Sequence, residues 1–414
     1  MTNQSTTKDV QPSRDTSSSG LPLENYNPFS STIEESYALY ARAQKECPVL
    51  RSNARGGFYL LTRYEDVRAA ALDSDLFSSA AGVIGLPPGQ SPARYPPIEM
   101  DPPEHGPWRR LFVEAFTPAA LRFLESEIIK ISNLLIDDFV ERGSCDLMHE
   151  FAETLPIFAI CKAIGLESSE PEVMRQFADD FNSASGDPEK SKDVLERIGA
   201  LMMSEINDRR RSPREDYLTR VALAEFDGRL IDESQMQMIL SGFLIAGHES
   251  TASALGSLLF YALSDPALRE RLLTDDSALA AAIEETVRLN APFQGFNRTT
   301  TAATEVGGVN IAEGQVVRLG FAAANRDPEA FENPEKFDID RLKKPHLGFG
   351  FGRHVCAGAP LARLELRIAV RTLLDRIPDI ALLDQKLELK LVGPLALPRA
   401  LRATFAPRSR DSHV

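Results

Sequence analysis

Cysteine is scarce in the 414-residue sequence, which contains only Cys47, Cys145, Cys161 and Cys356. No two of them form a Cys-x-x-Cys pair, so neither a zinc knuckle nor a disulfide framework is indicated, and the pattern fits a reducing cytoplasm. The sequence also lacks a Cys-x4-Cys-x2-Cys iron–sulfur spacing and a Gly-x-Gly-x-x-Gly motif after a strand. A cysteine with a chemical role must therefore act alone.

Long apolar runs and an excess of positive charge are also missing. Residues 1–20 are rich in Ser, Thr, Asp and Gln, which predicts a disordered tail rather than a signal peptide or membrane anchor. The most apolar later stretches are interrupted by polar residues and are not typical of transmembrane helices. The formal net charge of −14 argues against a surface for duplex nucleic acid. We expect a soluble, cytoplasmic monomer with no membrane anchor and no nucleic-acid partner.

What is present indicates one mainly helical domain with a small β region. No repeat or Pro-rich linker divides residues 21–414. Apolar spacing predicts helices over most of this length, including Thr117–Val140, where Thr117 can cap the helix and Pro118 can begin it. Strands are predicted at Phe58–Leu61 and, as a hairpin joined by "AEG", in "EVGGVNI" and "QVVRLGF".

The surroundings of Cys356 constrain its role. It lies in "GFGFGRHVCAGAP", just before a stretch whose apolar spacing predicts a helix. A sulfur at a helix N-terminus meets unpaired N–H groups and the positive end of the helix dipole, which favour a thiolate. Gly348, Gly350 and Gly352 let the preceding backbone fold closely around it. Such a setting can hold a thiolate metal ligand, although a lone cysteine taken by itself is more often a small buried residue beside a turn.

Phe349, Gly352, His354, Cys356 and Gly358 resemble the F-x-x-G-x-[HR]-x-C-x-G signature of the cytochrome P450 family, the heme-thiolate monooxygenases. The resemblance extends from about Pro28 to Phe405. It implies a single domain that holds heme b between a long central helix and the Cys loop. Cys356 would be the axial ligand of the iron, and Phe349 and Gly358 would contact the cofactor. A thiolate ligand favours cleavage of the O–O bond.

"EETVR" places Glu285 and Arg288 on one face of a helix. Taken alone, such a pair is usually a solvated surface ion pair. Its resemblance to the family's E-x-x-R implies instead that, with Arg341 of "FDIDR", it forms a buried triad that fixes the segment on the cysteine side of the heme. The stretch Ala324–Arg341 also resembles the family's segment that leads into the Cys loop.

The helix predicted for "LSGFLIAGHESTASALGSLLFYAL" is apolar except at its centre, where glycine and hydroxyl side chains predict a local bend. An ordinary kink is one reading. The stretch also resembles the family's A-G-x-[DE]-T-[TS], which implies that Ala246 and Gly247 open an oxygen-binding groove and that Glu249 and Ser250 deliver protons there. Serine replaces the commoner threonine, so either Ser250 or Thr251 supplies the hydroxyl.

"DPPEHGPWRR" resembles the family's D-P-P-E-H-x-x-x-R, which implies that His105 and Arg109 bind a heme propionate. Arg298 and His354 match the other propionate positions, and Trp108 either packs in the core or borders the heme edge. Without the resemblance, His105 could be a helix cap and Arg109 a surface charge.

The resemblance implies an enzyme that inserts one oxygen atom of O2 into a small or medium hydrophobic substrate of terpenoid or aromatic type. The pocket residues that it implies are Val83, Arg94, Tyr95, Ile98, Phe181, Ile239, Phe243, Phe293 and Phe296. Arg94 and Tyr95 could hold a substrate carboxylate or simply face solvent. Most of these residues come from a long loop between residues 77 and 100 and from the central helix.

Electrons are expected from a separate ferredoxin and its reductase. A basic docking patch is predicted from Arg109, Arg110, Lys343, Lys344 and Arg353, with scattered surface charge as the alternative. A heme-thiolate isomerase, a dehydratase or a peroxide-driven hydroxylase would need no acid–alcohol pair, so the pair favours oxygen activation. A heme sensor would need an output domain, and none is visible beyond the terminal "RSRDSHV".

Overall fold

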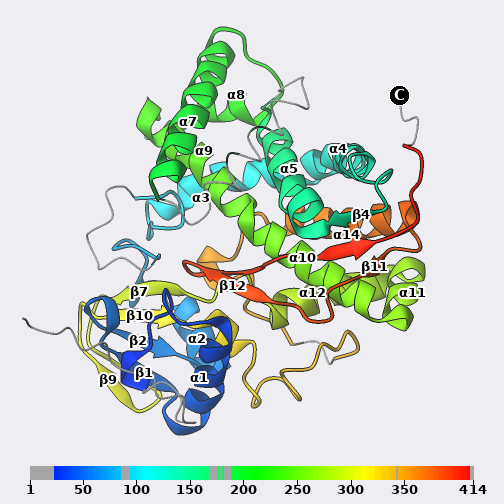
Figure 1. Ribbon diagram of the computed structural model, residues 1–414. Helices are drawn as coiled ribbons and strands as arrows, with labels where there is room; N and C mark the ends of the chain where they lie inside the picture. Colours follow the sequence, from blue (N-terminus) through cyan, green and yellow to red (C-terminus); the bar gives the residue numbers. More distant parts are fainter. Residues whose placement is uncertain are drawn as a thin grey trace, which may run out of the picture.

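The computed structural model describes residues 23–84, 94–166, 176, 180, 188–341 and 344–410. Phe181, Lys343 and the predicted tail lie outside these ranges. A five-stranded sheet with the order β1-β2-β10-β7-β3 forms the smaller part of the molecule, at the lower left of Figure 1. Its strands are β1 (Val49–Ser52), β2 (Phe58–Leu61), β3 (Phe77–Ser78), β7 (Phe296–Thr300) and β10 (Val316–Leu319).

The sheet is mostly antiparallel, and only β10 and β2 run parallel. Helices α1 (Ile33–Glu46) and α2 (Tyr64–Leu72) pack their apolar side chains against it, so this part has its own core. The predicted strand Phe58–Leu61 is confirmed. Register places Arg298 of β7 opposite Val317 of β10, which puts this arginine inside the fold rather than at its edge.

The predicted hairpin is wrong. The pairing strands are β8 (Thr304–Val306) and β9 (Val309–Ile311), both within "EVGGVNI". Gly307 and Gly308 have φ values of 56° and 80°, the left-handed backbone that a two-residue hairpin turn requires. Because this turn pairs the two halves of the segment with each other, β10 is left to pair with β2 and β7 instead of completing a hairpin across "AEG".

The larger part is helical, so the predicted mainly helical class with a small β region is confirmed. Its helices are α3 (His105–Val113), α4 (Pro118–Asp137), α5 (Thr154–Ile164), α7 (Pro188–Arg211), α8 (Tyr217–Ala222), α9 (Glu233–Gly247), α10 (Glu249–Ser264), α11 (Pro266–Thr274), α12 (Asp276–Leu289), α13 (Phe321–Ala324) and α14 (Ala359–Arg376). Figure 1 shows α9 and α10 following each other through the middle of the molecule. Helix α10 contacts α5, α11, α12 and α14, which explains why it is apolar on all sides.

Helix α4 forms as its sequence predicts but ends earlier. The Thr117 hydroxyl accepts a hydrogen bond from the backbone N–H of Ala120 at 3.3 Å, and Pro118 is the first helical residue. The helix stops at Asp137, because Asp138, Phe139 and Arg142 donate their backbone N–H groups in tighter turns. Its apolar face packs on α14 and α5, which fixes the position of the helix that follows Cys356.

Short elements complete the fold. Strands β11 (Ala381–Leu382), β14 (Arg402–Thr404) and β4 (Ser144–Asp146) form one small sheet, and β12 (Leu389–Val392) with β13 (Leu395–Pro398) and β5 (Glu225–Phe226) with β6 (Arg229–Leu230) form two hairpins. Single turns are η1 (Leu23–Asn25), η2 (Ala54–Gly56), η3 (Glu114–Phe116), η4 (Met148–Ala152) and η5 (Gly352–His354). Within the described ranges, no helix is both long and apolar enough to cross a membrane.

Candidate active site

Cys356 lies in a tight loop between η5 and the start of α14. Its backbone N–H donates to the carbonyl of Phe349 at 2.8 Å, which closes the loop. Gly352 has a φ of 71°, and a Cβ there would lie 2.6 Å from the carbonyl oxygen of Ala71 in α2. The loop can therefore approach α2 this closely only with glycine at that position.

The environment of the Cys356 sulfur combines desolvation with positive groups. Desolvation by the surrounding protein raises the pKa of its thiol, whereas the backbone N–H groups of Gly358 and Ala359 and the Arg109 guanidinium act in the opposite direction. The residue is nevertheless exposed, unlike Cys145 and Cys161, whose burial raises the pKa of each thiol to about 12. Among the four cysteines, Cys356 is the one that is both accessible and surrounded by groups that stabilise a thiolate.

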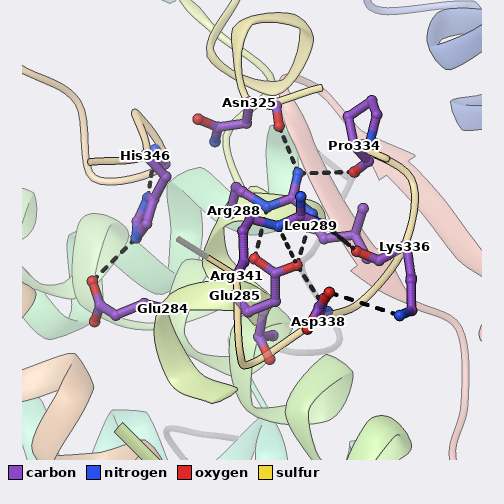
Figure 2. Close-up of polar contacts among 12 residues, drawn as sticks. Glu284, Glu285, Arg288, Leu289, Asn325, Pro334, Lys336, Asp338, Arg341 and His346 are labelled. Carbon is purple, nitrogen blue, oxygen red and sulfur yellow. Dashed lines mark hydrogen bonds and ion pairs between the residues drawn. The ribbon is translucent and has the colours of Figure 1, made fainter. Parts of the chain in front are cut away.

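A buried ion-pair triad supports the segment that leads to this loop. The Arg288 Nε lies 2.7 Å from Glu285 Oε2, and the Arg341 Nε lies 3.3 Å from Glu285 Oε1. Glu285 and Arg288 are only 6% and 2% exposed, so the pair is not a solvated surface pair. Arg288 Nη1 also donates to the carbonyls of Asn325 and Pro334, which Figure 2 shows converging on the guanidinium. The structure thus brings together the three residues of the predicted triad.

Sequence reasoning missed Glu284, which precedes the triad in the same motif. Its carboxylate accepts hydrogen bonds from Arg363 at 2.6 and 2.9 Å and from His346 at 3.1 Å (Figure 2 shows the His346 contact). Burial alone would raise the pKa of Glu284, but these partners lower it to about 2. Arg363 also lies 4.5 Å over the ring of Phe349. Glu284 therefore joins α12 to the Cys loop and to α14.

The predicted bend in the central helix is present at His248. Helix α9 ends at Gly247 and α10 starts at Glu249, and His248 between them has a φ of −90° and a ψ of −81°, outside the helical range. The buried His248 Nε2 donates to the carbonyl of Glu153 at 2.9 Å, so it carries the ring proton. The Ser250 hydroxyl donates to the carbonyl of Ala246 at 2.8 Å.

Four predicted propionate ligands form a cluster of basic side chains, which we call the cation cluster: His105, Arg109, Arg298 and His354. The rings of His105 and His354 are 4.7 Å apart between centroids. Burial, together with the charges of Arg298, His105 and Arg109, lowers the pKa of His354 to about 3. Burial likewise lowers the pKa of Arg298 to about 10. The other three members of the cluster therefore lie close enough to His354 to disfavour a charge on its ring.

The cation cluster fits a dianionic ligand. Among the residues that the structure describes, His105 Nε2 is buried without a hydrogen-bond partner, and the 4% exposed Arg298 donates to the carbonyl of Asn297. Asp101 is the acid whose charge reaches the cluster, and it already accepts hydrogen bonds from Ser78 and Ser79. Buried polar atoms are normally paired, so the cluster is suited to the carboxylates of a heme, with Cys356 available for the iron.

The predicted pocket residues fall into two groups. Val83 accepts a hydrogen bond from the Asn297 N–H at 2.9 Å, and the rings of Phe293 and Phe296 are 4.8 Å apart, so these three residues lie beside β7. Ile239 and Phe243 are buried on α9, where Phe243 stacks on Phe112 with centroids 3.9 Å apart. Phe293 packs against the same hydrophobic core that contains Ile239 and Phe243.

Other predicted residues are engaged within the protein. Arg94 is exposed and pairs with Glu104 at 3.2 Å, so a substrate carboxylate would have to compete with Glu104. Tyr95 and Ile98 are half-buried nearby. Trp108 is buried and packs edge-on against Phe226, with centroids 4.7 Å apart. Of the predicted docking residues, Arg110 and Arg353 are exposed, whereas Lys344 lies 3.5 Å from Glu65.

Known proteins are similar to this chain in sequence and in fold. The family model described as Cytochrome P450 matches residues 186–377. Cytochrome P450 107B1 of Saccharopolyspora erythraea is 37% identical, covering 82% of this chain and 87% of that protein. The mycinamicin IV hydroxylase/epoxidase of Micromonospora griseorubida is 33% identical, covering 87% of this chain and 94% of that protein. The substrate-free structure of Mycobacterium marinum cytochrome P450 CYP150A6 has a TM-score of 0.82 and 27% identity, covering 94% of this chain and 100% of that chain.

Proposed function

The chain belongs to the cytochrome P450 family and is a heme-thiolate monooxygenase. We propose that it inserts one oxygen atom of O2 into a hydrophobic substrate of small or medium size. We include terpenoid and aromatic compounds in this class, and take a ferredoxin with its reductase as the electron source. The relatives named as hydroxylases and epoxidases support the reaction type. The apolar residues Val83, Phe293 and Phe296 beside β7 support the substrate class.

The observation that carries this proposal is the break between α9 and α10. It places Glu249 at the first position of α10, and the Ser250 hydroxyl donates across the break to the carbonyl of Ala246. A hydroxyl that donates to a backbone carbonyl keeps lone pairs with which it can accept a proton from Glu249 or from water. The buried Thr251 is the alternative hydroxyl. Oxygen activation requires an acid and an alcohol at this point, whereas isomerase chemistry does not require them.

In this proposal Cys356 holds the iron, and His105, Arg109, Arg298 and His354 bind the propionates. The heme, when bound, supplies the oxygen-activating chemistry, and its thiolate ligand favours O–O cleavage. The triad of Glu285, Arg288 and Arg341 acts at a distance by holding the segment that precedes the Cys loop. The protein otherwise contributes orientation of the substrate, exclusion of water and the proton held by Glu249.

The absorption spectrum of the reduced protein under carbon monoxide tests the heme assignment. We expect a strongly red-shifted Soret band in the wild type and its loss in Cys356→His, because histidine is a neutral ligand. A globin-like band in the wild type would contradict the role of Cys356. Turnover with a surrogate ferredoxin and reductase is then compared with turnover driven by peroxide. Product formed only with peroxide would contradict the oxygen-dependent reaction.

The electron-donor proposal has its own test. Arg110 is exposed on α3 and Arg353 is exposed on η5, just before Cys356, and a negatively charged ferredoxin could dock there. Charge reversal by Arg110→Glu should slow ferredoxin-driven reduction of the heme, and the effect should shrink at high salt. An unchanged rate would leave these arginines as ordinary surface charges.

A further inference from the structure

A small cavity lies beside the break in the central helix, on the side of η4 and the β12–β13 hairpin. Its volume is about 90 Å³, and it is lined by His149, Glu153, His248, Glu249, Ala252, Lys390 and Leu397. This space is enough for roughly three water molecules, and the polar side chains among its lining residues can bind them by hydrogen bonds. Glu249, the acid of the proposed acid–alcohol pair, therefore borders a water-sized space that has no role in the function proposed above.

His149 and Glu153 form the outer wall of this cavity. The His149 Nδ1 lies 2.7 Å from Glu153 Oε2, and the two side chains are 51% and 10% exposed. The hydrogen bond to Glu153 raises the pKa of His149, as do the charges of Glu153 and Asp146, whereas burial and Lys390 act in the opposite direction. His149 can thus take a proton from solvent while it contacts a carboxylate that reaches inward.

His248 fixes the inner wall. Burial lowers the pKa of its imidazole to about 4, so the ring is neutral at neutral pH and is a poor proton carrier. Its hydrogen bond to the carbonyl of Glu153 joins the break in the central helix to the residue that precedes α5. His248 is therefore a positioning residue, which holds Glu249 and Glu153 on the same cavity.

We propose that His149 and Glu153 form the outer end of a proton route that runs from solvent, through water held in this cavity, to Glu249. Imidazolium Nδ1–H of His149 donates its proton to the Glu153 carboxylate, Glu153 passes a proton to a cavity water, and that water passes one to the Glu249 carboxylate. His149 then regains its proton from solvent. Glu249 then passes its proton on to the Ser250 hydroxyl, and only with this last transfer are the charges of the route restored; each step moves one proton and no electrons.

A metal centre is the other use that such a group of side chains suggests. Within the described part of the chain, no three His, Cys, Asp or Glu side chains come together as a metal site. A simple structural ion pair between His149 and Glu153 is the remaining possibility, and it differs in what it predicts. An ion pair affects stability, whereas a proton route also affects reactions that consume protons and their dependence on solvent deuterium.

The inference rests on the proposed function, and dioxygen itself serves as the probe. The heme-loaded protein receives electrons from a plant ferredoxin and its reductase, and oxygen consumption is followed in H2O and in D2O. We expect Glu153→Gln to lower the rate on the order of tenfold and to enlarge the deuterium effect, because a positioned proton donor has been removed. Ala252→Val, which fills the cavity without changing a charge, should act in the same direction, and Glu153→Asp should restore part of the rate.

Two controls and two readouts other than activity sharpen the test. Glu150→Gln makes the same chemical change in η4 outside the cavity lining, and Ala254→Val makes the same enlargement elsewhere on α10; both should leave the deuterium effect unchanged. A crystal structure of the heme-loaded wild type should show water between Glu153 and Glu249. Nuclear magnetic resonance should show that the pKa of His149 falls in Glu153→Gln.

The outcomes distinguish a failure of the proposed function from a failure of the proton route. A wild type without the thiolate-heme spectrum overturns the proposed function and this inference with it. A wild type that has this spectrum and consumes oxygen, but whose rate and deuterium effect are unchanged by Glu153→Gln and Ala252→Val, overturns the proton route alone. A dry cavity in the crystal structure would overturn it as well.

Discussion

The two sides of the proposed heme site treat buried charge in opposite ways. On the side of the segment that leads to Cys356, which we call the anchor region, the buried Glu285 pairs with Arg288 and Arg341 at 2.7 and 3.3 Å, and the partly exposed Glu284 pairs with Arg363 at 2.6 Å. In the cation cluster, buried basic groups face one another, and burial lowers the pKa of Arg298 and His354. The charges of the anchor region are paired within the protein, whereas the cation cluster has more hydrogen-bond donors than acceptors.

This difference indicates two separate tasks. Buried ions are stable in a fold only when opposite charges and hydrogen bonds replace their lost hydration. The anchor region meets this requirement with its own residues and can therefore hold the Cys loop whether or not a ligand is bound. The cation cluster meets it only with an added anion, so part of the free energy of ligand binding comes from relieving the repulsion among its members.

The largest expected effect comes from breaking the anchor region. Arg288→Ala leaves the Glu285 carboxylate buried beside Arg341 alone and frees the carbonyls of Asn325 and Pro334. We expect the free energy of unfolding to fall by about 3–5 kcal/mol, the usual consequence of removing one partner of a buried pair. Urea unfolding of the heme-loaded protein, followed by circular dichroism, measures it. A loss below about 1 kcal/mol would mean that the triad behaves as a surface pair.

The next effect should separate ligand affinity from folding. Arg298→Met removes a buried cation that lacks a carboxylate partner among the described residues, so we expect the affinity for heme to fall by roughly 10–100-fold, the value of one or two hydrogen bonds to a charged group. Transfer of heme to a protein acceptor measures the affinity. Arg318→Met is the matched control, since Arg318 is equally buried on the neighbouring strand but donates to Asn297. Equal heme loss in both variants would contradict the role of Arg298.

Much of the anchor region and the cluster could be anticipated because short motifs carry them. Glu285 and Arg288 lie one helical turn apart, and the glycines before Cys356 have a recognisable local reason, confirmed by the φ of Gly352. The cap at Thr117 is equally local. Periodicity and backbone preference are sufficient for the helix face, the turn and the cap, but the burial of the triad and the membership of the cation cluster were implied only by the family resemblance.

The parts that sequence reasoning missed depend on distant residues or on competing pairings. The hydrogen bond between His248 and Glu153 joins positions 95 residues apart, and nothing in the periodicity of either segment indicates it. The cavity that they share is a consequence of that packing. The hairpin was wrong for a different reason, because the Gly307–Gly308 turn offered a shorter pairing than the one that alternation suggested.

The free energy of unfolding, measured at a series of pH values, should distinguish Glu284, a paired acid, from His248, a desolvated base. The pKa of Glu284 is lowered to about 2 from 4.5, so its contribution to stability is present above pH 4.5 and is lost as the pH falls toward about 2. His248 is neutral in the fold down to a pKa of about 4, but it takes up a proton near 6.5 when unfolded. Its contribution is therefore complete above pH 6.5 and is lost on the way down to about 4.

Single substitutions should remove these two windows separately. In urea unfolding at a series of pH values, His248→Gln should flatten the dependence between pH 6.5 and 4, and Glu284→Gln should flatten only the part below 4.5. The measurement is the difference in unfolding free energy from the wild type at each pH. A Glu284→Gln variant that also lost the dependence near pH 6 would show that the two regions titrate as one.

The smallest effect is expected from an exposed pair with the same chemistry as the triad. Arg271 donates to both oxygens of Asp340 at 2.8 and 2.9 Å, but the two side chains are 49% and 69% exposed. Because water already solvates both groups, Arg271→Ala should change the free energy of unfolding far less than Arg288→Ala does, and added salt should reduce even this difference. Urea unfolding of Arg271→Ala and of Arg288→Ala under the same conditions makes the comparison direct. If the two arginines proved equally important, bidentate geometry rather than burial would account for the strength of the triad, and the contrast between the anchor region and the cation cluster would need another explanation.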